Sequence, residues 1–151
     1  MAEMNDPNAA RKAWMGVLSK ADAAAVAQVW ATMNIAPAHT LLRAPEIGGV
    51  MVRGRAGATG AAFNLGEMTV TRCSLKLADG TVGHAYVQGR DKEKARVAAL
   101  VDALMQTDQA EDVAARVIAP LRDGATTHKA SRAAKAAATK VDFFTMVRGE
   151  D

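Results

Sequence analysis

Cysteine, aromatic residues and long apolar runs are all scarce in this chain of 151 residues. The single cysteine, Cys73, cannot form an internal disulfide and cannot alone build a thiolate metal cluster, which fits a reducing compartment. No apolar run is long enough to span a bilayer, and no charged-then-apolar signal segment is visible. These absences disfavour disulfide-stapled and membrane-spanning classes, and we expect a cytoplasmic protein.

Aromatic residues make up only 4% of the chain, and alanine supplies much of its 50% hydrophobic content. A chain of this length is expected to form one domain, here residues 1–151, and can bury about 68–70% of its unfolded surface. Its core must rest on few large side chains, so burial contributes less per residue than in a chain rich in leucine and phenylalanine. A partner surface would add to that burial.

Strong charge of one sign is also missing. The formal net charge is +3 and the isoelectric point is near 9.2. Such a mildly basic balance permits a phosphate-bearing partner without requiring nucleic acid. An alanine-rich basic stretch over residues 127–140 hints at a nucleic-acid-binding module, but it lacks interleaved aromatic residues, which makes this class the least favoured.

The periodicity predicts an α+β domain that begins with a helix pair. Trp14, Val17 and Leu18 share one helical face, and Ser19 and Asp22 have the spacing of a capping box for the second helix. A central antiparallel meander of about four strands follows. We expect these strands at residues 40–44, 49–55, 63–77 and 82–88, with a type I′ hairpin turn at Asp79-Gly80.

Helices are expected after the meander. Asp91 can cap the first of them, and another runs from about Gln109 to Leu121 before a turn at Asp123-Gly124. Residues 127–140 have high helix propensity and almost no apolar stripe, so they form either a solvated helix or one that packs closely through alanine. The last segment, residues 141–151, is too apolar for a free tail. We expect it to dock on this domain or on another chain through Phe143, Phe144, Met146 and Arg148.

The stretch from Gly49 to Ser74 carries most of the candidate chemistry. Gly54, Gly57 and Gly60 are spaced G-x-x-G-x-x-G, which is neither the dinucleotide fingerprint nor a P-loop. Backbone N–H groups in such a loop can cradle phosphate, although a flexible β connection is the favoured alternative. The ligand-binding candidates are Arg53, Arg55, Gly57, Gly60 and Arg72.

Glu67 is the one candidate for a catalytic group, as a general base or magnesium ligand. A structural ion pair or an interface charge is the favoured alternative. No metal site is predicted, because His39, His84 and His128 lie far apart in the sequence. No nucleophile–base arrangement can be argued from spacing, so the catalytic residues are otherwise unknown.

Two longer stretches carry a more specific pattern. They are VMVRGRAGATGAAFNLGEMTVTRCSLKLADGTVGHAYVQGRD and VDFFTMVRGE. Two shorter motifs accompany them, W-M-x-V-L-S at Trp14 to Ser19 and L-x-D-A-L-M-Q at Leu100 to Gln106. Together they resemble the PhnG family, the G subunit of the bacterial carbon–phosphorus lyase machinery, over nearly the whole chain. The chain departs from the family pattern at Ala58, where the family has glycine, and at Ala62, where proline is common.

The resemblance implies a role in the breakdown of organic phosphonates. The family's G, H and I subunits, aided by L, replace the adenine of ATP with a phosphonate such as methylphosphonate, and J later cleaves the product by radical chemistry. G, H, I and J form a core assembly, and ATP and magnesium are substrates of the complex rather than cofactors of this chain alone. The I subunit is the usual candidate for the nucleosidase-like chemistry, so we expect a non-autonomous transferase subunit whose catalytic centre lies mainly on another chain. In the alternative, Arg53, Arg55 and Arg72 hold the triphosphate on this subunit and Glu67 acts as base or metal ligand.

Overall fold

The computed structural model describes residue 6 and residues 8–141. Its helices are α1 (Ala9–Lys20), α2 (Ala23–Met33), α3 (Lys92–Leu104), α4 (Ala110–Val113) and α5 (Ala119–Ala138), with a 3-10 turn η1 (Ala56–Ala58) and a π-helical segment η2 (Ala114–Ile118). Its strands are β1 (His39–Arg55), β2 (Ala62–Leu77) and β3 (Val82–Gln88). The predicted α+β class, with a helix pair ahead of an antiparallel meander, is confirmed.

The sheet in the described residues has three strands in the order β1-β2-β3, so the predicted count of four is wrong. The runs 40–44 and 49–55 form the single strand β1, which passes through Pro45. Proline is tolerated there because β1 is an edge strand. The pairing of β1 with β2 shifts register between Leu41 and Arg43 and again between Arg43 and Glu46. These irregularities accommodate Pro45, which has no backbone N–H group to donate to β2.

The hairpin between β2 and β3 lies where it was predicted, but its turn is not type I′. Gly80 has a φ of 93°, whereas Asp79 does not adopt a positive φ, and type I′ requires positive φ at both central residues. The N–H of Gly80 bonds to the carbonyl of Leu77 at 3.0 Å, and the Asp79 carboxylate accepts from the N–H of Thr81 at 2.8 Å. The turn is therefore a three-residue loop that ends in a left-handed glycine.

Aspartates cap both α2 and α3. The Asp91 carboxylate accepts from the N–H of Lys94 at 2.7 Å, which confirms the predicted cap of α3. Asp22 caps α2 by accepting from the N–H of Ala24 at 3.0 Å. Ser19 lies in the last turn of α1, and its hydroxyl donates to the carbonyl of Gly16, so the predicted capping box is wrong. The carboxylate already satisfies the first turn of α2.

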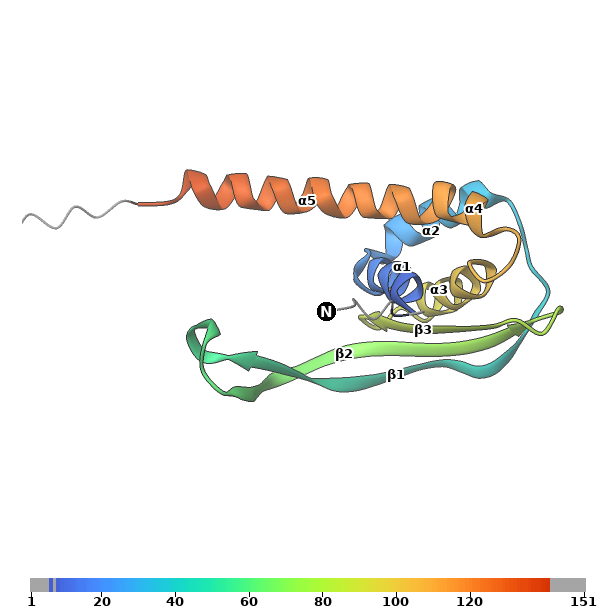
Figure 1. Cartoon of the computed structure of the whole chain (residues 1–151), viewed down its shortest axis with the longest axis horizontal. Helices are drawn as coiled ribbons and strands as arrows, with labels where there is room; N and C mark the ends of the chain where they lie inside the picture. Colours follow the sequence, from blue (N-terminus) through green and yellow to red (C-terminus); the bar gives the residue numbers. More distant parts are fainter. Residues whose placement is uncertain (1–5, 7, 142–151) are drawn as a thin grey trace, which may run out of the picture.

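Helix α3 is the centre of the core, between the sheet and the other helices (Figure 1). Every residue from Lys94 to Leu104 except Arg96 is buried. The helix lies so close to β3 that a Cβ added at Gly83 would be 2.0 Å from the carbonyl oxygen of Ala99. The small residue on β3 thus sets the distance between sheet and helix.

The predicted turn at Asp123-Gly124 is wrong, because α5 runs unbroken from Ala119 through both residues. A glycine inside a helix costs only about 1 kcal/mol relative to alanine, which neighbouring helical residues can offset. All residues of α5 after Leu121 are exposed. We call residues 122–138 the helical arm. The 127–140 stretch is therefore a solvated helix within this single chain.

A two-stranded ribbon also projects from the domain, in addition to the helical arm. Strand β3 pairs with β2 only from Val70 to Lys76, so residues 62–69 of β2 pair with β1 alone. We call residues 49–69 the hairpin arm. The hairpin arm and the helical arm extend from the same side of the domain (Figure 1). No helix in the described part of the chain is long and apolar enough to cross a membrane.

Candidate functional site

A buried carboxylate joins the helices to the sheet. Asp102 is fully buried on α3 and accepts from Arg11 Nη2 at 2.7 Å, from Arg11 Nε at 3.1 Å and from Trp14 Nε1 at 2.9 Å. It also accepts from the backbone N–H of His84 on β3, at 2.8 Å. Four donors thus converge on one carboxylate from α1 and β3.

This arrangement has the chemistry of a structural junction. The hydrogen bonds and charge of Asp102 raise the pKa of the Arg11 guanidinium above its ordinary value. A buried charge is stable only when it is paired and hydrogen-bonded, as Asp102 is. Asp102 was not among the functional residues predicted from the sequence. The available signal was an aspartate inside the apolar run from Leu100 to Leu104.

Charged residues also meet on the exposed face of the sheet. Glu46 accepts from Arg43 at 3.0 Å and from Arg72 at 3.1 Å, and hydrogen bonds from Arg72 first and then Arg43 hold the pKa of Glu46 below its ordinary value. Arg72, a predicted ligand-binding residue, is therefore paired with Glu46 in the isolated chain.

Ser74 and His84 lie opposite each other on β2 and β3, on the same exposed part of the sheet. Ser74 Oγ is 2.9 Å from His84 Nδ1. A hydroxyl beside an imidazole is the first half of a nucleophile–base pair, but a working pair also needs a third group that orients the imidazole. The pair is better described as a cross-strand hydrogen bond.

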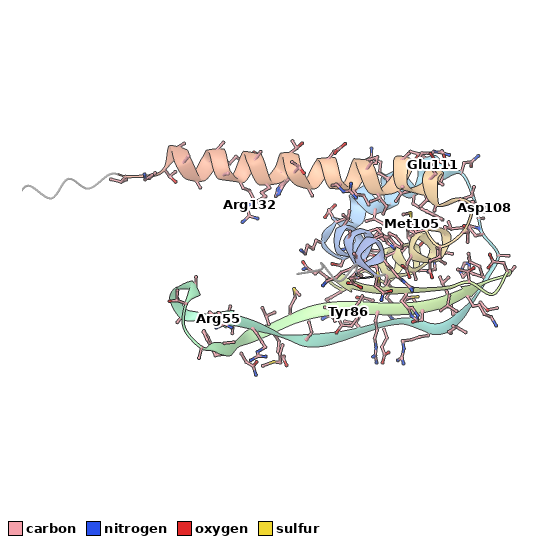
Figure 2. The ribbon with its side chains drawn as sticks, in the orientation of Figure 1. Arg55, Tyr86, Met105, Asp108, Glu111 and Arg132 are labelled. Carbon is pink, nitrogen blue, oxygen red and sulfur yellow. The ribbon has the colours of Figure 1, made fainter. Side chains whose placement is uncertain are left out.

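The tip of the hairpin arm brings together part of the predicted phosphate site. A shallow recess of about 460 Å³ is lined by Arg53, Gly54, Arg55, Ala58 and Ala62. One guanidinium there is already engaged, since Arg55 Nη1 donates to the carbonyl of Gly60 at 2.9 Å. Figure 2 shows Arg55 at this end of the arm. The two arginines share the recess, and their charge suits an anion.

The other predicted site residues lie elsewhere on the arm. Gly57, with a φ of 57°, and Gly60 shape the turn but do not line the recess. Arg72 is eight residues along β2 from Asn64, the partner of Arg53, a separation of about 26 Å at the rise of a strand. Glu67 is exposed on the arm opposite Met51. The structure therefore unites Arg53 and Arg55 but places Arg72 and Glu67 apart from them.

A larger groove of about 1980 Å³ lies between α5 on one side and α2 with the β3–α3 junction on the other. Its lining includes seven lysine and arginine residues and two aspartates, Asp22 and Asp91. The basic helix over 127–140 was predicted from the sequence, but the wall that faces it was not, because that wall combines residues from separate stretches of the chain.

One cation of this groove is built into the fold. Lys94 is 5% exposed, and its ammonium donates to the carbonyls of Ser19 and Gln88, both at 3.2 Å. Burial lowers the pKa of Lys94, while Asp22 and Asp91 oppose that shift. The ammonium joins the end of α1 to the end of β3.

The predicted interface residues Phe143, Phe144, Met146 and Arg148 lie outside the described residues. Large apolar side chains are nevertheless exposed within the described part of the chain. On the hairpin arm they are Met51, Phe63 and Leu65, with exposed fractions of 49%, 46% and 66%. Apolar patches of this kind mark interaction surfaces when they are contiguous.

Comparison with known proteins covers nearly all of the chain. The family model described as "Phosphonate metabolism protein PhnG" matches residues 9–149. The alpha-D-ribose 1-methylphosphonate 5-triphosphate synthase subunit PhnG of Rhizobium meliloti (strain 1021) is 42% identical in a match that covers 95% of this chain and 92% of the relative. A match of this extent, spanning the helix pair, both arms and the buried junction, shows that the chain belongs to the PhnG family of phosphonate metabolism proteins.

Proposed function

We propose that this chain is an obligate subunit of a complex that forms a ribose 1-phosphonate 5-triphosphate from ATP and an alkylphosphonate such as methylphosphonate. In that reaction the bond between adenine and the anomeric carbon of ATP breaks, and a phosphonate oxygen forms the new bond to that carbon. The observation that carries the proposal is the similarity to a named subunit of such a synthase over 95% of the chain.

The two arms support a role that depends on partners. The helical arm buries none of its side chains within the described chain, and the hairpin arm exposes Met51, Phe63 and Leu65. An isolated two-stranded ribbon is marginally stable in water, and so is a helix that is exposed on all sides. Both arms would gain stability from a surface that covers them.

The partners in this proposal are the H, I and J subunits of the carbon–phosphorus lyase core, with the L subunit needed for activity. The experiment is co-expression of the four core subunits with an affinity tag on one partner. Recovery of this chain, intact and in fixed ratio, is the expected result. Absence of this chain from the purified assembly would contradict the proposal.

A second candidate function rests on the recess at the hairpin tip. Arg53 and Arg55 line it together, and charge-assisted contacts from arginine to phosphate are strong and directional. In this version the arm carries the triphosphate of ATP into a site shared with another subunit, and Mg²⁺ accompanies the nucleotide. Glu67 on the same arm would act as base or metal ligand.

Variants of the assembled complex distinguish the two candidate functions. Arg53→Ala with Arg55→Ala, Glu67→Gln and Arg72→Ala are compared with Arg122→Ala, an exposed arginine on α5 outside both hollows. If this chain binds the substrate through these residues, adenine release falls at least tenfold in the Arg53/Arg55, Glu67 and Arg72 variants while assembly is unchanged. Full adenine release by all of them leaves the chain as an assembly subunit only.

A further inference from the structure

The groove between α2 and α5 concentrates positive charge. With histidine neutral, its seven lysines and arginines exceed its two aspartates by five charges, whereas the whole chain carries +3. The rest of the molecule is therefore net acidic. The groove therefore carries more net positive charge than the chain as a whole.

Three of the four lysine and arginine residues of the helical arm line this hollow. Lys129, Arg132 and Lys135 line the groove, and the only acidic residue of α5, Asp123, does not. Figure 2 shows Arg132 extending from α5 toward the side on which the hairpin arm lies. Ala125, Ala133 and Ala136 of the same helix line the groove beside these cations.

More cations stand across the groove. Lys20 at the end of α1 and Arg90 at the β3–α3 junction are on the facing wall. None of Lys20, Arg90, Lys129, Arg132 and Lys135 forms an ion pair with another residue in the described part of the chain. Like charges that face each other across a hollow repel, so the arrangement favours an anionic occupant.

The size of the groove selects the class of that occupant. Small-molecule sites have volumes of roughly 300–1,000 Å³. The groove, at about 1980 Å³, is larger than such sites. Small residues on a helix face allow another backbone to approach closely, and three alanines of α5 line the groove beside the cations.

We propose that this groove receives an acidic polypeptide segment of a partner subunit, held by the cations of α5 on one side and by Lys20 and Arg90 on the other. The inference rests on the proposed function and adds the chemistry by which the partner is recognised. It assigns the helical arm to an electrostatic interface, separate from the apolar side chains of the hairpin arm.

The test uses the assembled complex, immobilised through a tag on a partner subunit and washed with rising salt. Lys129→Glu with Arg132→Glu is the charge-reversal variant, and Arg122→Glu on the same helix but outside the groove is the matched control. We expect the reversal to lower the salt concentration that releases half of this chain at least twofold. The control should release at the wild-type concentration. Circular dichroism of each full chain verifies the fold, which these exposed positions should not affect.

A carbodiimide cross-link identifies the occupant, because it joins a lysine to a carboxylate in direct contact. Cross-links from Lys129 and Lys135 to aspartates or glutamates of one partner segment are the expected result. Cross-links to Glu150 or Asp151 of this chain, or tight binding of tripolyphosphate or single-stranded DNA with unchanged salt release of the variant, would overturn the inference. If the wild-type chain never enters the complex, the proposed function itself has failed. If wild type and reversal variant assemble alike, only the groove assignment has failed.

Discussion

Arg11 and Asp102 are 91 positions apart in the chain, yet their side chains form a two-point ion pair, with Nη2 to Oδ2 at 2.7 Å and Nε to Oδ1 at 3.1 Å. The carboxylate is fully buried, whereas the arginine side chain is 30% exposed. The pair fixes α1 against α3 and, through the N–H of His84, against the sheet. The arms project from a body held together at this point.

Removing the cation of this pair should weaken the fold. Arg11→Ala leaves a buried carboxylate with only Trp14 and a backbone N–H as donors, and we expect a loss of about 3 kcal/mol in the free energy of unfolding. Urea denaturation measures the loss. Lys12→Ala, an exposed neighbour, should stay within about 0.5 kcal/mol of wild type. Equal stability of the two variants would show that Asp102 does not depend on its partner.

Gly83 should tolerate no side chain. In Gly83→Ala the new Cβ would lie 2.0 Å from the Ala99 carbonyl oxygen and 2.8 Å from the Ala103 Cβ, so α3 must move away from β3. We expect a loss of about 3 kcal/mol, at the upper end for overpacked cores. Gly66→Ala is the control on another strand, since nothing lies within 4 Å of its added Cβ. A stable Gly83→Ala protein would mean that the sheet and α3 are farther apart than described.

The pKa of Glu46 should depend on its arginine partners. Its folded value lies below the ordinary value because of Arg72 and Arg43, so its contribution to stability is present above the ordinary pKa and is lost as pH falls through the folded pKa. In Arg72→Ala the pKa should move back up toward the ordinary value. A carboxyl NMR titration measures this, with Lys76→Ala on the same strand as control. No difference between the two variants would argue against the pair.

The tip of the hairpin arm should prefer glycine at position 58. Ala58 has a φ of 64°, a left-handed conformation that costs a non-glycine residue about 1–2 kcal/mol. Part of that cost is offset by the greater freedom of glycine in the unfolded chain. In Ala58→Gly the N–H of Gly60, bonded to the carbonyl of Ala56 at 3.0 Å, should exchange about threefold more slowly, the equivalent of ~0.7 kcal/mol. Ala61→Gly, without a positive φ at that position, should exchange no more slowly than wild type.

The sequence predicted those elements of the fold that depend on residues close together in the chain. The Asp91 cap, the β2–β3 hairpin and the helical character of residues 127–138 all follow from neighbouring residues. The single strand through Pro45 could not be predicted from neighbouring residues. Proline is acceptable only on an edge strand, and whether a strand lies at the edge depends on the whole sheet.

The candidate sites show the same division. Arg53 and Arg55 share one face through the alternation of a strand, and both line the recess, whereas their role in binding a ligand stays a prediction. The Asp102 junction and the basic groove were not predicted, since each gathers side chains from segments tens of residues apart. The separation of Arg72 from the tip depends on how far β1 and β2 extend beyond β3, which composition alone does not indicate.

The central claim is that the two arms are docking surfaces of a subunit that functions only in a complex. Hydrogen exchange of the full chain, alone and within the assembled H, I and J complex, tests it most directly. We predict that amides of residues 122–138 and 49–69 become at least tenfold more protected on assembly, while the buried core of α3 changes little. Unchanged exchange in both arms within a complex that contains this chain would contradict the account.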